Sequence, residues 1–357
     1  MTLIAAMILC HSASSFEPLN LKEIQPVGTV DASRGHLAFQ WPSSGFVVRF
    51  SGSQLVADLE DSADGAPSPN GGTASNSVEV RVDGGPGKAV VLKPGRNRIS
   101  LAEGLAEGLH IASVRKRTES HVGVIPLFGL DAPGGIKNPP AKGRRLTVYG
   151  DSNSCGYGAE AASREIRYSP STQNSEAAFP AITARALGLE LNLIAASCWG
   201  VLRGHGGDKF TSVPSVWDRV FIEKPEPLAT GQESAAVLVI LGDNDFAQGD
   251  PGSEFESAYL SFVKQIRKKD PACPILLCTS SFMQGDGLKR KVGEAIDRVI
   301  AALGDSRISR FNLPAYQESW GYGADWHISL GGHRKVAEPL IARLEGMRVG
   351  RRVGSGA

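Results

Sequence analysis

Three residues of types that catalyse ester chemistry stand in separate blocks of the second half of the chain. Ser152 lies in LTVYGDSNSCGYG, where an apolar run passes abruptly into Gly-Asp-Ser. Asn244 lies in LGDNDFAQG, and His327 lies in YGADWHISLGGH, just before a predicted helix. Gly-Asp-Ser by itself also fits an ordinary turn or a helix N-cap, because its residues favour both. The serine therefore indicates catalysis only if partners reach it.

The residue types together predict acyl transfer. A serine hydroxyl is a weak nucleophile and needs a base within hydrogen-bond reach, a role that His327 can fill. The tetrahedral oxyanion needs fixed donors, which backbone N–H groups and the Asn244 amide supply. An acid near the histidine fixes its tautomer, and Asp325 stands two residues before it. No Gly-x-Ser-x-Gly surrounds Ser152, which argues against an α/β-hydrolase elbow.

The elements that must position these residues change in character near residue 140. Residues 25–131 contain short alternating runs such as GFVVRF, SVEVRVDGG and HIASVRKR, which predict an antiparallel β-sandwich. Residues 132–144 are rich in Gly, Pro and basic residues and are interpreted as a linker. Residues 145–348 alternate continuous apolar runs with helical stretches, which predicts a three-layer α/β domain with a mostly parallel five-stranded sheet.

The predicted sheet explains how distant blocks can meet. Ligands of an open parallel sheet bind outside the carboxyl ends of its strands. Ser152 follows the first predicted strand of this domain, the block ASCWGVLRG follows the second, and Asn244 follows the third. We therefore expect these blocks and the His327 loop at one edge of the sheet.

Composition limits the partners of the protein. The chain has 357 residues, of which 41% are hydrophobic and 21% charged, and its formal net charge is +1. Without a basic block or an acidic tail, we expect no nucleic-acid or membrane partner, and we expect a monomer. An apolar run followed by small residues predicts a signal peptide over residues 1–15 and a secreted or periplasmic protein, with a buried N-terminal strand as the alternative.

The cysteines do not have the spacing of a zinc site, and we expect no metal. Cys155 and Cys198 fall on neighbouring predicted loops, where they could form a disulfide or remain free thiols. We favour free thiols.

The blocks around these residues, in this order, resemble the SGNH (GDSL-like) hydrolase superfamily, which is named for Ser, Gly, Asn and His. The matching residues are Ser152, a glycine in ASCWG, Asn244 and His327. With the preceding FQWPSSGFVVRFSG, VEVRVDGG and GLHIASVRKRTE, almost the whole chain resembles carbohydrate esterase family 2. That resemblance implies a jelly-roll domain before the SGNH domain. It also implies a serine esterase that removes O-acetyl groups from plant polysaccharides or oligosaccharides of the xylan and glucomannan type, without metal or organic cofactor.

Two departures from the superfamily pattern leave assignments open. The acid commonly stands three residues before the histidine, but here that position is Ala324 and the acid is Asp325. A triad with Asp325 and a dyad whose histidine is oriented by a main-chain carbonyl both remain open, and we favour the triad. Related sequences often read Ser-Gly-x-Gly where this chain reads Ser197-Cys198-Trp199-Gly200. The N–H of either Cys198 or Gly200 therefore joins that of Ser152 and the Asn244 amide in the predicted oxyanion hole.

Two tryptophans flank the predicted site. Trp199 and Trp326 are interpreted as substrate-binding residues that stack on sugar rings, with simple packing as the alternative. The alternative functions are an SGNH lipase, thioesterase or arylesterase on non-carbohydrate esters, and a carbohydrate-binding protein with weak catalysis. The sandwich domain favours the carbohydrate esterase, because lipid-directed members of the superfamily usually have no such domain.

Overall fold

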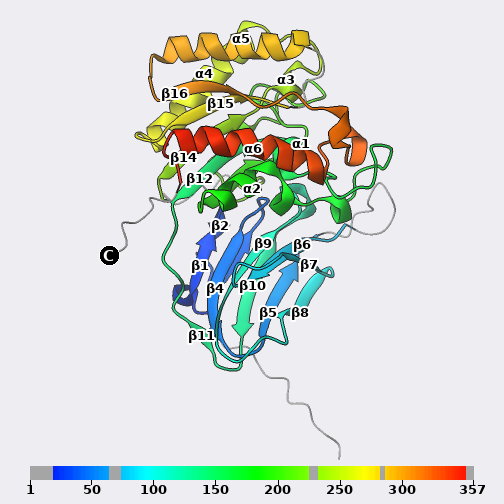
Figure 1. The fold of residues 1–357 in the computed structure, drawn as a ribbon, viewed down its shortest axis with the longest axis vertical. Coiled ribbons are helices and arrows are strands. Elements are labelled where there is room, and N and C mark those ends of the chain that lie inside the picture. The colour runs from blue at the N-terminus through cyan, green and yellow to red at the C-terminus, as the bar shows by residue number, and fades with distance from the viewer. Residues whose placement is uncertain (1–18, 64–73, 225–231, 282–285, 351–357) are drawn as a thin grey trace, which may run out of the picture.

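The computed structural model describes residues 19–63, 74–224, 232–281 and 286–350, which form an antiparallel β-sandwich followed by an α/β domain (Figure 1). Both domains agree with the predicted fold class. The predicted signal peptide lies outside the described residues. Among the described helices, none combines the length and the apolar character that a membrane span requires.

Two antiparallel sheets enclose the core of the sandwich. One has the strand order β1-β4-β9-β6-β7 with β11 paired to β4, and the other has the order β2-β3-β10-β5-β8. Alternation places Phe46, Val48 and Phe50 of β4 in this core, as period-two side-chain directions require. The strands are β1 (Ile24–Val27), β2 (Val30–Asp31), β3 (Leu37–Phe39), β4 (Gly45–Ser51), β5 (Leu55–Asp61), β6 (Ser77–Val82), β7 (Lys88–Val91), β8 (Gly95–Ala102), β9 (Leu109–Lys116), β10 (Ile125–Asp131) and β11 (Ile136–Lys137).

The predicted linker is not wholly irregular. Within residues 132–144, β11 pairs antiparallel with β4, so that Ile136 lies opposite Phe50. The sandwich therefore extends slightly beyond its predicted end, because the chain adds a short edge strand before it crosses to the next domain.

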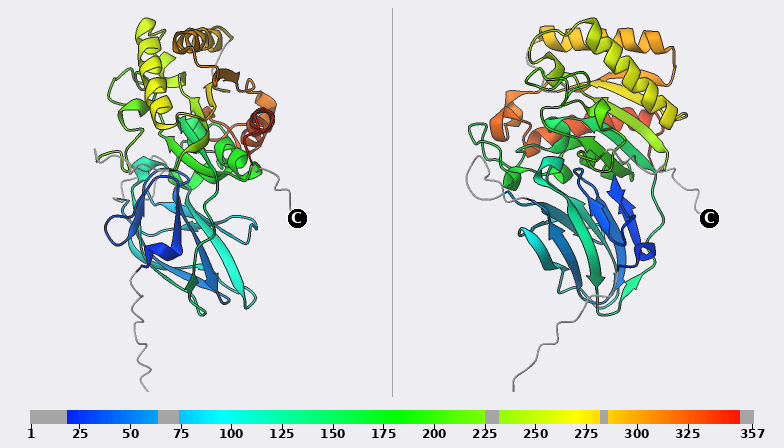
Figure 2. Two further views of the ribbon diagram at one scale, coloured as in Figure 1. Left: turned by 90° about the vertical axis from the view of Figure 1, so that its left-hand side faces the viewer. Right: turned by 180° about the vertical axis from the view of Figure 1, so that it is seen from behind.

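The α/β domain has one five-stranded parallel sheet with the order β13-β12-β14-β15-β16. Its strands are β12 (Arg145–Gly150), β13 (Glu190–Ala195), β14 (Ser234–Ile240), β15 (Ile275–Thr279) and β16 (Ile308–Asn312). The helices are α1 (Ser152–Cys155), α2 (Phe179–Ala186), α3 (Asp243–Phe246), α4 (Ser253–Lys269), α5 (Asp286–Leu303) and α6 (Leu330–Gly346). Figure 2 shows α4 and α5 on one side of the sheet and α6 on the other.

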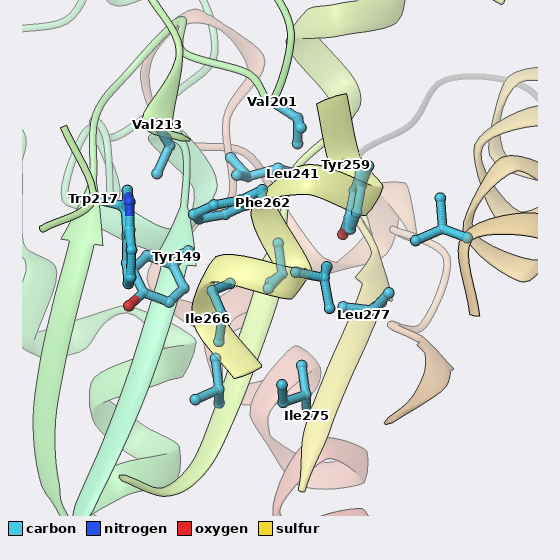
Figure 3. Close-up of a cluster of buried hydrophobic side chains, with 14 of the residues drawn as sticks. Tyr149, Val201, Val213, Trp217, Leu241, Tyr259, Phe262, Ile266, Ile275 and Leu277 are labelled. Atoms are coloured by element: carbon cyan, nitrogen blue, oxygen red, sulfur yellow. The ribbon is translucent and has the colours of Figure 1, made fainter. Parts of the chain in front are cut away.

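The continuous apolar strands are explained by burial on both faces of this sheet. Every residue of β14 is buried. Val237 and Val239 belong to the cluster under α4 and α5, in which Phe262 also packs (Figure 3). Ala236 and Leu238 point the other way, into the cluster under α2 and α6. Because successive side chains face opposite layers and both layers are apolar, residues 235–240 of β14 form a continuous apolar run.

The sandwich and the α/β domain share part of their interior. Trp41 of the sandwich is buried in the same cluster as Tyr149 and Trp217 of the α/β domain, and its indole N–H donates to the Arg219 carbonyl at 3.1 Å. Thr29 Oγ1 donates to Asn192 Oδ1 at 2.8 Å across the same interface. The first domain is therefore packed onto the second rather than tethered to it.

Candidate active site

Ser152 stands at the carboxyl end of β12, where the chain turns into the short helix α1. The Asp151 carboxylate accepts the N–H of Asn153 at 3.0 Å and caps this helix, so Ser152 is its first residue. The two interpretations of Gly-Asp-Ser, helix cap and nucleophile, therefore apply to adjacent residues. The cap fixes the first turn and with it the direction of the serine.

His327 meets the serine from the loop before α6. Its Nε2 lies 3.1 Å from Ser152 Oγ, and its Nδ1 lies 3.0 Å from the main-chain oxygen of Asp325. A carbonyl oxygen can only accept, so Nδ1 carries the proton and Nε2 presents its lone pair to the serine hydroxyl. This is the tautomer that a general base needs.

The Asp325 carboxylate does not occupy the place that the triad prediction gave it. Its Oδ2 accepts the hydroxyl of Tyr157 at 3.0 Å and the N–H of Tyr168 at 2.7 Å. The backbone of Asp325 is left-handed, with φ 48° and ψ 41°, and this turn aims its carbonyl rather than its side chain at His327 Nδ1. The geometry thus matches the dyad alternative, and the preference for a triad is corrected here.

Asp325→Asn is expected to lower kcat only about tenfold, against the 10³–10⁴-fold loss of a true triad acid. The amide oxygen can take over both hydrogen bonds of Oδ2, and the carbonyl that holds His327 is unchanged. Steady-state hydrolysis of p-nitrophenyl acetate measures the effect. A loss of three orders of magnitude would instead make the carboxylate the orienting group.

An aromatic stack supports the imidazole. The centroid of the Tyr157 ring lies 4.1 Å from that of the His327 ring. The Tyr168 ring stacks on the Tyr157 ring, with the two centroids 4.2 Å apart. Burial under these rings lowers the pKa of His327, although the Asp325 carbonyl and the Glu119 charge act in the opposite direction. The imidazole is therefore held neutral and fit to accept a proton at neutral pH. Sequence reasoning missed both tyrosines, although Tyr157 follows Ser152 by only five positions.

The N–H of Cys198 is placed to join the oxyanion hole. Cys198 lines the same pocket as Ser152 and Asn244, and within the described part of the chain its N–H has no hydrogen-bond partner. Gly200, by contrast, donates its N–H to the Thr211 carbonyl at 3.3 Å. Of the two residues left open by the sequence, we therefore assign the donor to Cys198, and Gly200 is removed from the predicted oxyanion hole. A Cβ on Gly200 would come within 2.3 Å of the Arg203 carbonyl, so the glycine serves close packing.

Cys198 is held in a conformation that L-residues disfavour. Its φ is 67°, in the left-handed region, where a side chain costs about 1–3 kcal/mol unless the surroundings enforce it. The loop is fixed downstream by Asp245, whose carboxylate accepts the N–H groups of Val201, Leu202 and Arg203 at distances from 2.7 to 3.1 Å. Sequence reasoning did not give Asp245 this role, although it directly follows Asn244.

Asn244 comes from α3, directly after β14, and its Nδ2 donates to the Trp199 carbonyl at 2.9 Å. One amide hydrogen is used in this bond, and the second can serve the oxyanion. We expect Asn244→Ala to lower kcat by about 10²–10³-fold, the usual effect of removing one side-chain donor. Comparison of kcat and KM on p-nitrophenyl acetate tests this. A change in KM alone would make Asn244 a binding residue.

These groups face a pocket of about 790 Å³. Trp326 forms part of its wall and remains 48% exposed, with the Arg164 guanidinium 3.9 Å from its ring centre. Trp199 is not among the residues that line this pocket and packs against the hydrophobic core instead. The half-buried Trp199 therefore matches the packing alternative rather than the substrate-binding one, while its carbonyl accepts from the Asn244 amide. Trp326 has the exposure that a sugar-stacking residue needs.

The described residues also test the predictions for a disulfide and for a metal site. Cys155 and Cys198 are both free thiols, as we favoured. No group of three or more His, Cys, Asp or Glu side chains within the described ranges is placed to hold a metal ion.

Comparison with known families divides the chain at the same point as its fold. Residues 27–140 match the model "Carbohydrate esterase 2 N-terminal", and residues 148–335 match the "GDSL-like Lipase/Acylhydrolase family". Two curated proteins are similar. Cellulase/esterase CelE of Acetivibrio thermocellus is 30% identical over 315 residues, which are 85% of this chain and 37% of that protein. An acetylxylan esterase / glucomannan deacetylase of Cellvibrio japonicus is 25% identical over 86% of this chain and 85% of its own length.

A solved structure shares the whole architecture. A family two carbohydrate esterase from Clostridium thermocellum, in complex with cellohexaose, superposes with a TM-score of 0.84 at 27% identity. The match covers 91% of this chain and 99% of the other. Since the first curated relative is much longer than this chain, the likeness to it concerns just over a third of that protein.

Proposed function

Because the chain belongs to the GDSL-like lipase/acylhydrolase family and carries the N-terminal domain of family 2 carbohydrate esterases, we propose that it removes O-acetyl groups from polysaccharides or oligosaccharides of the xylan or glucomannan type. The observation that carries the proposal is the 3.1 Å contact between Ser152 Oγ and His327 Nε2 in a pocket walled by the half-exposed Trp326. The name of the Cellvibrio japonicus relative, an acetylxylan esterase / glucomannan deacetylase, supports the substrate class, and the name of the other curated relative, cellulase/esterase CelE, supports esterase activity.

The geometry supports a two-step acyl transfer. Ser152 Oγ attacks the acetyl carbonyl carbon while His327 Nε2 takes the hydroxyl proton, and the charge on the carbonyl oxygen is met by the N–H groups of Ser152 and Cys198 and the Asn244 amide. The C–O bond to the sugar then breaks, and the imidazolium returns its proton to the departing sugar oxygen. Water then attacks the carbonyl carbon of the acetyl-serine while His327 Nε2 takes one of its protons. The bond from that carbon to Ser152 Oγ breaks, His327 returns the proton to Oγ, and acetate leaves.

One set of assays tests both which acyl group and which polysaccharide the protein prefers. Acetate release is measured from acetylated xylan, acetylated glucomannan and p-nitrophenyl esters of increasing chain length. We expect activity on the polysaccharides and on the acetyl ester, falling steeply with longer acyl groups. Higher kcat/KM on long-chain esters than on acetylated sugars would favour a lipase or arylesterase, and binding of oligosaccharide without acetate release would favour a binding protein.

The proposed substrate belongs to the plant cell wall and lies outside the cell that degrades it. We therefore propose that the protein acts after export, directed by residues 1–15. Fractionation of an expressing culture tests this, since activity confined to the cytosol would contradict it.

A further inference from the structure

The segment that follows β9 of the sandwich runs along the α/β domain. Arg117 Nη2 lies 2.6 Å from Glu160 Oε2, and the Arg117 carbonyl accepts the N–H of Ser175 at 3.0 Å. Two residues on, the N–H of Glu119 donates to Gln173 Oε1 at 3.0 Å. This part of the sandwich is thereby fixed to the loops around Ser152.

Glu119 places a carboxylate at the start of the oxyanion loop, which we define as residues 197–203. Its side chain is fully buried. Oε2 accepts the N–H of Ser197 at 2.8 Å, and Oε1 accepts the Ser197 hydroxyl. A buried carboxylate is costly unless charge-assisted hydrogen bonds replace its water, and Ser197 supplies two of them.

The charge of this carboxylate is preserved. Burial alone raises the pKa of Glu119, but the interaction with His121, whose Nδ1 lies 3.5 Å away, and the two Ser197 donors outweigh it and leave the pKa below its usual range. Glu119 is therefore ionised at neutral pH and acts as a strong acceptor.

The oxyanion loop is held from two sides. Asp245 binds three N–H groups after Cys198, and Asn244 binds the Trp199 carbonyl, but both of these anchors belong to the α/β domain. Glu119 holds the residue directly before Cys198 and belongs to the sandwich. Since Cys198 has a left-handed backbone that it would leave if released, its N–H needs an anchor on each side to keep its direction.

We propose that Glu119 is a positioning residue of the esterase: by binding Ser197 it directs the N–H of Cys198 toward the oxyanion. The inference rests on the proposed ester hydrolysis by Ser152. It makes the N-terminal domain a contributor to the transition state and not a separate binding module, because the carboxylate acts through the loop without touching the substrate.

The test is steady-state hydrolysis of p-nitrophenyl acetate by the full chain. We expect Glu119→Ala to lower kcat about 10²-fold, the effect of a small misplacement of a catalytic group. KM should stay within about twofold, because the oxyanion exists only beyond the ground state. Glu119→Gln should recover kcat to within about tenfold of wild type, because its amide oxygen can accept the Ser197 N–H and its NH₂ can donate to the hydroxyl.

Arg117→Met is the matched control. It removes an ion pair across the same interface, two residues from Glu119, without touching Ser197. We expect a lower Tm with kcat close to wild type. If Arg117→Met lost as much kcat as Glu119→Ala at an equal loss of Tm, the effect would be a loosened interface and the inference would be wrong.

The remaining outcomes separate this inference from the proposed function. An active wild type with unchanged kcat in Glu119→Ala overturns the role of Glu119 alone, whereas a wild type that releases no nitrophenol overturns the esterase itself. If Glu119→Ala does not fold, Ser197→Ala removes one of the two hydrogen bonds instead. A several-fold fall in kcat at constant KM then supports the inference, and wild-type kcat contradicts it.

Discussion

Ser152→Ala is expected to lower the kcat for acetyl esters by about 10⁴–10⁶-fold, the range seen when the nucleophile of a serine hydrolase is removed. Without Oγ no acyl-enzyme can form, and only the oxyanion donors and the pocket remain. The change deletes one oxygen from a helix whose cap is formed by Asp151, so the fold should be retained. Hydrolysis of p-nitrophenyl acetate and of acetylated xylan measures the loss.

The acyl-enzyme gives a second readout for this variant. Wild-type protein treated with a slow acylating ester should gain the mass of one acyl group, and the Ser152→Ala protein should gain none. An unchanged circular dichroism spectrum and Tm serve as the control for folding. Near-normal turnover by Ser152→Ala would end the serine-hydrolase interpretation, because the nucleophile that interpretation assigns is the Ser152 hydroxyl, 3.1 Å from His327 Nε2.

The strand-end pattern made the meeting of distant residues predictable. Ser152 and Asn244 each lie in the short segment that follows a buried parallel strand, and strands of one parallel sheet end at one edge. The structure brings both into one pocket with His327, which comes from the loop before the last helix. The periodicity of the strands was enough to predict that these residues meet, because the prediction did not depend on any side-chain contact.

The details that sequence could not provide depend on backbone direction. Residues i and i+2 lie on the same face of an extended segment, so an extended chain would place the Asp325 side chain on the same side as His327. The chain instead turns at Asp325, and this turn presents the carbonyl to the histidine and leaves the carboxylate to Tyr157 and Tyr168. A sequence pattern specifies which groups are near, whereas φ and ψ specify which of them faces the histidine.

Contacts between the two domains were the features that the sequence could predict least. Glu119 lies in a charged stretch at the end of a sandwich strand, where exposure to solvent is the usual expectation. Its burial against Ser197 depends on how the sandwich packs on the α/β domain, and no local pattern encodes that packing. The same holds for Trp41, which looks like a sandwich core residue but belongs to the cluster of the neighbouring domain.

His327→Ala is expected to cost about as much as loss of the serine, about 10⁴–10⁶-fold in kcat, because nucleophile and base act as one unit. For the same reason the double variant Ser152→Ala/His327→Ala should be no slower than either single variant. Additive losses would show that the two residues act independently, which their 3.1 Å contact opposes. The measurement is kcat for p-nitrophenyl acetate at saturating substrate, with Tm as the control for folding.

The pH dependence of the wild type tests the same base from another direction. The neutral imidazole is the active form, so protonation of His327 in the free enzyme sets the acid limb of kcat/KM. Burial lowers the pKa of His327, and a lowered pKa means that the proton binds only at more acidic pH. The acid limb should therefore lie below 6.5, the ordinary pKa of histidine. We expect kcat/KM to be retained at pH 6.5 and to fall only at more acidic pH. Tyr157→Ala would open the imidazole to water, because it removes a tilted ring whose centroid lies 4.1 Å from that of the imidazole, and it should move this limb to higher pH. If the acid limb of kcat/KM stayed at the same pH in this variant, the Tyr157 ring would not be what shields His327 from water.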